Sequence, residues 1–150
     1  MKTQIVAVWL LVCVAVFSAD DPLEHYSIAD IETAVRSGKV GSEYAERAKK
    51  MQDLRVREIV RERIPYQLFT FSDFRGGYTL LVEAKDKFVV LCTAMGGGYA
   101  YNFTLAKEKD KEVLYYLYNS GSGRRFEHRA KYVIGSGKPE DTAARSYITP

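Results

Sequence analysis

The side chains that could form a catalytic or metal site are few. Beyond residue 18 the chain has one cysteine, Cys92, and two histidines, His25 and His128. Cys92 and His128 have the chemistry of a thiol nucleophile and its base, but no spacing brings them together, and His128 falls on the apolar face of an alternating segment. One cysteine and two histidines also fall short of a typical zinc site. We therefore expect no enzyme, no metal and no cofactor.

Tyrosine and arginine are the residue types best suited to a binding surface. All 11 tyrosines follow residue 18, and tyrosine combines a rigid apolar ring with a polar tip. A basic strip at 124–131, together with Arg57, Arg61 and Arg63 on a predicted helix, suits an anionic glycan or an acidic lipid. The alternatives are tyrosines that fill the core and a strip that is merely solvated. The predicted binding residues are Arg75, Gly76, Gly77, Tyr78, Gly97, Tyr99, Tyr116, Arg125 and Arg129.

Asn102 begins the triplet Asn-Phe-Thr, the type of sequence that accepts an N-linked glycan. The odd-numbered residues from Tyr99 to Leu105 are apolar or aromatic, so they are predicted to face one way and Asn102 the other. This places Asn102 on the polar face of a strand. We therefore predict a glycan on Asn102, with a chance match on a rigid strand as the alternative.

The first 18 residues have the features of a secretory signal. Lys2 precedes an apolar run at 5–17, and the small residue Ser18 follows it. The run is too short to span a bilayer comfortably. We expect a secreted, extracellular protein without membrane insertion. The formal net charge of +3 is too close to balance to indicate a nucleic-acid partner.

Cys92 lies in a predicted strand at 87–94. Phe88, Val90 and Cys92 are two residues apart and are expected to share one face, which favours a buried thiol. The alternative is a disulfide-linked dimer through Cys92.

Two helices are predicted before the strands. Ser27 is a plausible N-cap with Asp30 three residues on, and Gly38 ends the first helix. The second helix is predicted over 42–63, before Pro65, because opposite charges recur four residues apart.

From Tyr66 to Ile134 the apolar pattern has a period of two. Short breaks separate six strands and require neighbouring strands to be antiparallel. The predicted strands are 66–72, 78–84, 87–94, 98–106, 112–119 and 125–134. The expected fold is α+β: two N-terminal helices packed on a six-stranded antiparallel meander, with one sheet face buried and one wet. A polar segment at 19–26 leads into a single domain at 27–134, and a flexible tail follows at 135–150.

Residues 42–105 resemble the cystatin superfamily. A long predicted helix is followed by an extended segment, by the strand Arg75–Ala84, which contains Gly-Gly-Tyr, and by more antiparallel strands. Cystatins have a helix wrapped by such a sheet, so the resemblance implies a cystatin-like roll. Their inhibitory hairpin carries Gln-x-Val-x-Gly, whereas residues 72–76 here read Ser-Asp-Phe-Arg-Gly.

These features favour a secreted, non-catalytic binding protein. The predicted surface is the Tyr- and Arg-rich sheet face or the hairpin loops at 74–77 and 95–98, and the predicted partner is an extracellular protein, glycan or matrix component. One alternative is a cystatin-like protease inhibitor that uses the same loops. Another is an extracellular carrier that holds a small apolar ligand between helix and sheet.

Overall fold

A computed structural model of the chain describes residues 24–95, 98–121 and 126–146. The predicted signal at 1–18 lies outside these residues. Within them the chain forms two helices, α1 (Ile28–Ser37) and α2 (Ser42–Lys49), followed by eight strands. The strands are β1 (Arg55–Ile59), β2 (Leu68–Asp73), β3 (Gly76–Ala84), β4 (Lys87–Met95), β5 (Ala100–Glu108), β6 (Lys111–Ser120), β7 (Phe126–Val133) and β8 (Glu140–Ser146).

The first helix forms as predicted. The Ser27 hydroxyl accepts a hydrogen bond from the Asp30 N–H at 3.3 Å, and the Asp30 carboxylate accepts one from the Ser27 N–H at 2.8 Å. Gly38 ends α1 with a φ of 78°, a left-handed conformation that glycine adopts without strain. Ile31 and Val35 face the core and are completely buried.

The prediction of a helix over 42–63 is wrong beyond Lys49. The chain leaves α2 there and forms β1, which is antiparallel to β2. The spacing of Asp53 and Arg57 favoured a helix, but Asp53 lies in the turn before β1 and Arg57 on β1, and both are exposed, as charged residues also are on an open strand. The basic residue Arg57 therefore lies on a strand and not on a helix.

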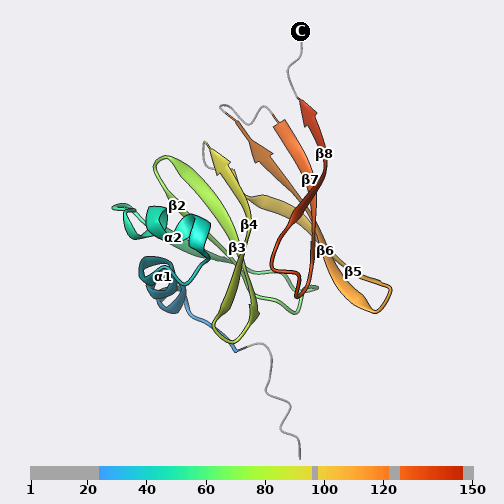
Figure 1. The fold of residues 1–150 in the computed structure, drawn as a ribbon, viewed down its shortest axis with the longest axis horizontal. Helices are drawn as coiled ribbons and strands as arrows, with labels where there is room; N and C mark the ends of the chain where they lie inside the picture. Colours follow the sequence, from blue (N-terminus) through green and yellow to red (C-terminus); the bar gives the residue numbers. More distant parts are fainter. Residues whose placement is uncertain (1–23, 96–97, 122–125, 147–150) are drawn as a thin grey trace, which may run out of the picture.

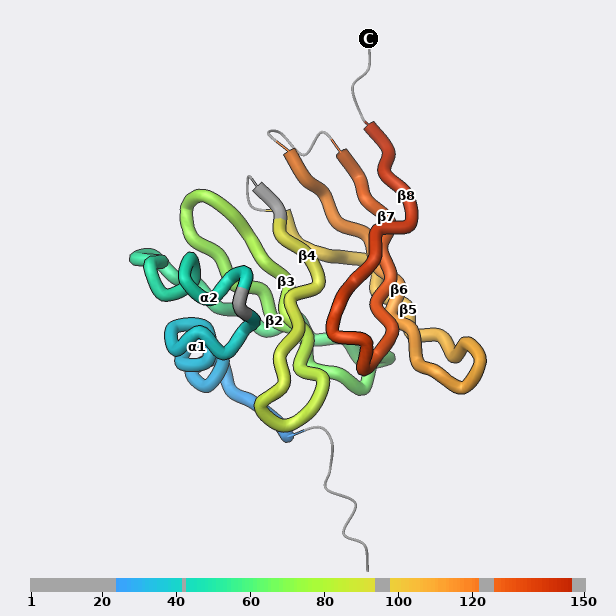
Figure 2. The backbone as a smooth tube through the Cα atoms, in the orientation of Figure 1, coloured from blue at the N-terminus to red at the C-terminus, as the bar shows by residue number. Residues whose placement is uncertain are grey.

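The prediction of one six-stranded meander on two helices is also wrong. The described strands form two four-stranded antiparallel sheets, in the orders β1-β2-β3-β4 and β5-β6-β7-β8. Each sheet consists of strands that follow one another along the chain, which passes from one sheet to the other between β4 and β5 (Figure 2). The expectation of a cystatin-like roll, in which a single sheet wraps around a helix, is wrong for the same reason.

The last strand lies within the segment predicted to be a flexible tail. β8 pairs with β7 from Lys131–Glu140 to Phe126–Ser146. All of its residues are exposed, so it has no apolar alternation that could reveal a strand. Backbone hydrogen bonds to β7 hold it in place instead.

The described elements form three layers: the helices, the first sheet and the second sheet (Figure 1). The central part of the first sheet, along β2, β3 and most of β4, is buried on both faces, whereas β1 has no buried residue. Phe71 and Leu80 pack against Ile31 and the other helical residues on one face. Leu81 packs against Leu114 of the second sheet on the other. Each large apolar side chain contributes about 1.5–3 kcal/mol when fully buried, so β3 stabilises both cores.

A bulge in β4 determines where Cys92 lies. The β3 partners of Val90 and Cys92 are consecutive residues, so Leu91 is an extra residue in the ladder. Val90 consequently packs in the core under the helices, whereas Leu91 and Cys92 pack between the sheets. The prediction that Phe88, Val90 and Cys92 share one face is wrong because the bulge reverses the alternation.

A second irregularity lies in β5. The register shifts between Tyr101 and Thr104, and Asn102 has a φ of 52°, which asparagine tolerates better than most residues. Phe103 packs toward the core between the sheets, whereas the Tyr101 hydroxyl donates to Glu127 at 2.7 Å on the outer face. The predicted alternation over 99–105 therefore fails at the bulge, although Asn102 is exposed as predicted.

Candidate functional site

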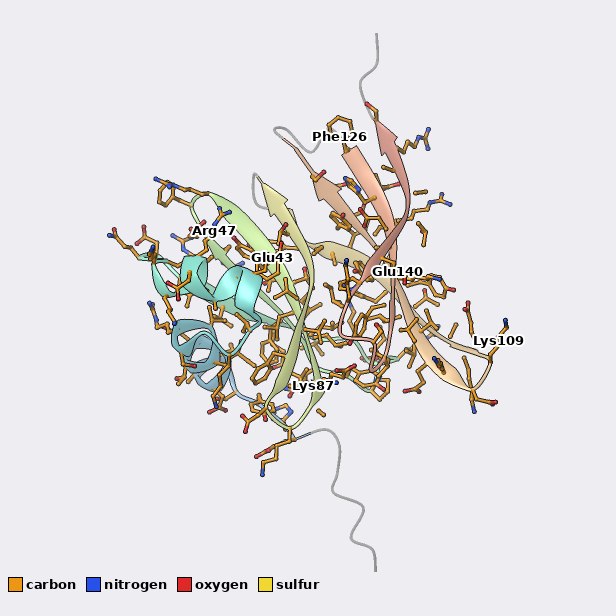
Figure 3. All side chains as sticks on the ribbon, in the orientation of Figure 1. Glu43, Arg47, Lys87, Lys109, Phe126 and Glu140 are labelled. Carbon is orange, nitrogen blue, oxygen red and sulfur yellow. The ribbon has the colours of Figure 1, made fainter. Side chains whose placement is uncertain are left out.

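A cleft of about 710 Å³ opens along β4, between α2 and the β7–β8 hairpin. β4 is an edge strand of the first sheet. One of its edges pairs with β3, and the other pairs with none of the described strands. Figure 3 shows Glu43 of α2 on one side of β4 and Glu140 of β8 on the other. The cleft therefore lies at one open side of the two-sheet sandwich.

The lining of the cleft combines aromatic rings with a few charged groups. Tyr44, Phe88 and Tyr118 contribute rings from three different elements. Glu43, Lys138 and Asp141 contribute charged groups. The volume falls within the range of about 300–1,000 Å³ that is typical of small-molecule sites. Such a lining can bury an apolar body and orient a polar end.

Four polar side chains converge on the inner face of the second sheet beside this cleft. Ser120 Oγ lies 2.7 Å from His128 Nε2, and His128 Nδ1 lies 3.4 Å from Asp141 Oδ2. The Tyr118 hydroxyl donates to the Asp141 carboxylate at 2.9 Å. The Tyr118 ring also stacks on the His128 imidazole, with centroids 4.5 Å apart. Three adjacent strands, β6, β7 and β8, thus hold the four groups together.

In the sequence, Cys92 is the partner that suggests itself for His128. The structure instead brings Ser120 and Asp141 to this histidine, in the atom order of a Ser-His-Asp triad. The pairing of Ser120 with His128 could have been predicted from the sequence. In an antiparallel hairpin that pairs Tyr118 with His128, Ser120 and His128 are diagonal neighbours on one face. Asp141 carried no such signal, because its strand was predicted to be tail.

This arrangement makes the Tyr118 hydroxyl less acidic than an ordinary tyrosine. Burial and the hydrogen bond to Asp141 raise the pKa of Tyr118 above its ordinary value of 10.0. Its hydroxyl therefore stays protonated at neutral pH and acts as a donor.

The predicted loop at 74–77 forms a tight turn. The Asp73 carboxylate accepts hydrogen bonds from the N–H groups of Arg75 and Gly76 at 2.8 and 2.9 Å. Phe74 is 78% exposed at the tip, and the Arg75 guanidinium lies 4.9 Å from the centre of its ring. Arg75, which is also exposed, is therefore an accessible part of the predicted binding surface.

Gly77, at the start of β3, packs closely against the segment before β5. A Cβ atom at this position would lie 2.7 Å from the Gly98 carbonyl oxygen and 2.7 Å from the Tyr99 ring. Such distances leave no room for a side chain. The structure therefore brings Gly77, predicted in the loop at 74–77, into contact with Tyr99, predicted at the start of the strand 98–106.

Two of the predicted binding tyrosines are core residues. Tyr78 is 2% exposed and stacks on Phe71 with centroids 4.6 Å apart. Tyr116 is also 2% exposed, and its hydroxyl donates to the Leu91 carbonyl of the facing sheet at 2.6 Å. Neither side chain can form an accessible surface. The sequence placed both tyrosines in strands but could not show that the helices cover Tyr78 and that the first sheet covers Tyr116.

The remaining predicted residues are distributed over the molecule. Arg129 is exposed on the outer face of the second sheet, across from Leu117. Gly97 and Arg125 lie outside the described residues. The predicted binding residues therefore do not form one continuous surface.

Cys92 is buried between the sheets, with 6% of its surface exposed. Burial raises the pKa of its thiol to about 11. The buried alternative of the sequence analysis is thus the one that matches its position. A disulfide-linked dimer would require this sulfur to leave the interior.

Among residues 24–95, 98–121 and 126–146, no group of three His, Cys, Asp or Glu side chains is arranged to hold a metal ion. No helix in this part of the chain is both long and apolar enough to cross a bilayer. Comparisons with protein-family models, curated proteins and solved structures found no match to the chain. The relationship to cystatins therefore stays a prediction.

Proposed function

We propose that the protein is an extracellular binding protein that carries a small organic ligand in the cleft along β4. The cleft is the observation that carries this proposal, because its volume and its mixed lining suit a ligand with an apolar body and a polar end. Phe88 and Tyr44 would contact the body, and Lys138 or Asp141 the polar end. This is the carrier alternative of the sequence analysis, with the ligand at an open side of the sandwich.

A neutral fluorophore tests the proposal without testing charge. N-phenyl-1-naphthylamine should bind the secreted protein at one saturable site, seen as a rise in its fluorescence. Thr93 is an exposed residue of the cleft lining, so Thr93→Trp should fill the cleft and weaken binding at least about tenfold. Lys107→Trp, at an exposed position of β5 outside the cleft and outside the Asn102 triplet, should bind as the wild type does.

Native mass spectrometry of the secreted protein gives a second measure. A co-purified small molecule that leaves on denaturation would support a carrier and identify its ligand. The proposal fails if the fluorophore does not saturate, or if both tryptophan variants bind it equally.

A second candidate function, ester hydrolysis, is favoured by the alignment of Ser120, His128 and Asp141. With Nδ1 protonated toward Asp141, His128 Nε2 would accept the Ser120 hydroxyl proton as Oγ attacks an ester carbonyl. The alcohol would leave with that proton, and water would then release the acid and restore Ser120. Gly121 directly follows the nucleophile, and its N–H is a candidate donor to the oxyanion.

A fluorophosphonate probe tests this second function. The peptide that contains Ser120 should carry the label, and Ser120→Ala and His128→Gln should each abolish labelling while circular dichroism stays unchanged. Ser136→Ala, in the β7–β8 hairpin, is the matched control and should be labelled normally. Absence of label on Ser120 in the wild type would mean that the cluster only ties β6, β7 and β8 together.

A further inference from the structure

Two arginines of β1 line a small pocket. β1 is the edge strand of the first sheet opposite β4. Arg55 and Arg57 alternate along β1, so both side chains lie on one face of the strand. Thr70 and Ser72 are their direct partners on β2. These four residues and Tyr99 line a pocket of about 100 Å³. The residues that line the pocket therefore carry two guanidinium groups and three hydroxyls.

No carboxylate lines this pocket. Among the ion pairs of the described residues, none involves Arg55 or Arg57. Nearby carboxylates have other partners, since Glu58 accepts a hydrogen bond from Gln67 and Asp73 holds the β2–β3 turn. Two like charges two residues apart on one strand face repel each other. An anion between them would remove that repulsion.

We propose that this pocket binds one tetrahedral oxyanion, a phosphate or sulfate group, either free or as a monoester. The planar guanidinium groups of Arg55 and Arg57 match the oxygen pairs of such an ion. The hydroxyls of Thr70, Ser72 and Tyr99 supply further donors. The volume equals that of roughly three water molecules, which suits one such group. This site is independent of the cleft along β4.

Titration calorimetry at constant ionic strength tests the site. The probes are inorganic phosphate, inorganic sulfate and glucose 6-sulfate, each added to the wild-type protein. We expect one saturable site, and Arg55→Gln and Arg57→Gln should each weaken binding at least about tenfold, because a charge-assisted contact is lost. Arg61→Gln, an exposed arginine outside the pocket, should bind with unchanged affinity.

The three probes separate the possible sources of the ion. Binding of inorganic phosphate or sulfate supports a site for the free ion, and binding of glucose 6-sulfate alone supports a site for a monoester. The proposal is overturned if none of the probes saturates, or if Arg61→Gln weakens binding as much as Arg57→Gln. If an arginine variant fails to fold, amide NMR shifts of the wild-type protein decide. At least one of the three probes must then move the signals of 55–57, 70–72 and 99 and leave those of β8 unchanged.

Discussion

The contact of Gly77 with Gly98 and Tyr99 depends on the absence of a side chain. Gly77→Ala should destabilise the protein by about 1–3 kcal/mol, because the new methyl group would overlap a backbone oxygen and a ring. Urea unfolding followed by circular dichroism measures this difference. Since the backbone at 77 is not left-handed, the loss would be steric.

Gly135→Ala is the informative control for that substitution. Gly135 has a φ of 89° but open space around it, so its replacement tests backbone strain alone and should cost about 1 kcal/mol. Equal stability of Gly77→Ala and wild type would show that the two segments do not pack as described.

The buried thiol of Cys92 should be inert in the folded protein. Its burial and a pKa of about 11 keep it protonated and shielded from reagents at pH 8. In the secreted form without residues 1–18, Cys92 is the one cysteine, so Ellman's reagent should react slowly with the native protein and with one thiol per chain in urea. Rapid reaction of the native protein, or a dimer that disappears with reductant, would contradict this position.

At the scale of elements, β3 and β8 differ in both burial and strand pairing. β3 is buried along nearly its whole length and pairs on both sides, whereas every residue of β8 is exposed and the strand pairs only with β7. Amide exchange of β8 should therefore be faster than that of β3 by orders of magnitude, because β8 can detach without opening a core. Peptide-resolved exchange at pH 7 measures both strands, and equal protection would contradict this difference.

Sequence reasoning located the strands that have apolar alternation and missed those that do not. β2 to β7 lie close to their predicted ranges, because their inner residues are apolar or aromatic. β1 was hidden by charges whose spacing also fits a helix, and β8 has no apolar residue larger than alanine. The division into two sheets could not be predicted, because hairpin turns alone do not show that β4 and β5 fail to pair.

The candidate site was less predictable than the fold. His128 was correctly placed on an inward face, but its partners come from a strand end and from an unpredicted strand. The pocket at Arg55 and Arg57 was missed because β1 was predicted to be part of a helix. On a helix these two residues would point in different directions, and only on a strand do they share a face.

For the whole molecule, Glu83 is a buried link between the two sheets. Its carboxylate accepts hydrogen bonds from the Tyr132 hydroxyl at 2.7 Å and from the Gly135 N–H, and Lys87 Nζ lies 2.6 Å from it. Burial alone would raise the pKa of Glu83. The hydrogen bonds from Lys87, Tyr132 and Gly135 outweigh burial and lower it below 4.5.

This lowered pKa predicts the pH dependence of stability. The ionised carboxylate contributes its stabilisation above pH 4.5, and the contribution is lost as the pH falls through the lower folded-state pKa. Glu83→Gln should therefore be about 1–3 kcal/mol less stable than wild type at pH 7, and the gap should narrow towards pH 3. Urea unfolding at both pH values measures this gap.

Glu46→Gln is the control for Glu83. Glu46 is exposed and pairs with Lys49 on the surface of α2, so its loss should change stability by less than about 0.5 kcal/mol at either pH. A gap for Glu83→Gln that stays constant between pH 7 and pH 3 would contradict the role of its charge.

The single passage between β4 and β5 divides the chain into two halves that each complete their own hydrogen-bonded ladders. Residues 24–95 and 98–146 should therefore behave as complementary fragments. Each would expose half of the core between the sheets when alone, and the pair would reassemble when mixed. Reporter halves fused to the two fragments would turn the contact between the sheets into a measurable reconstitution.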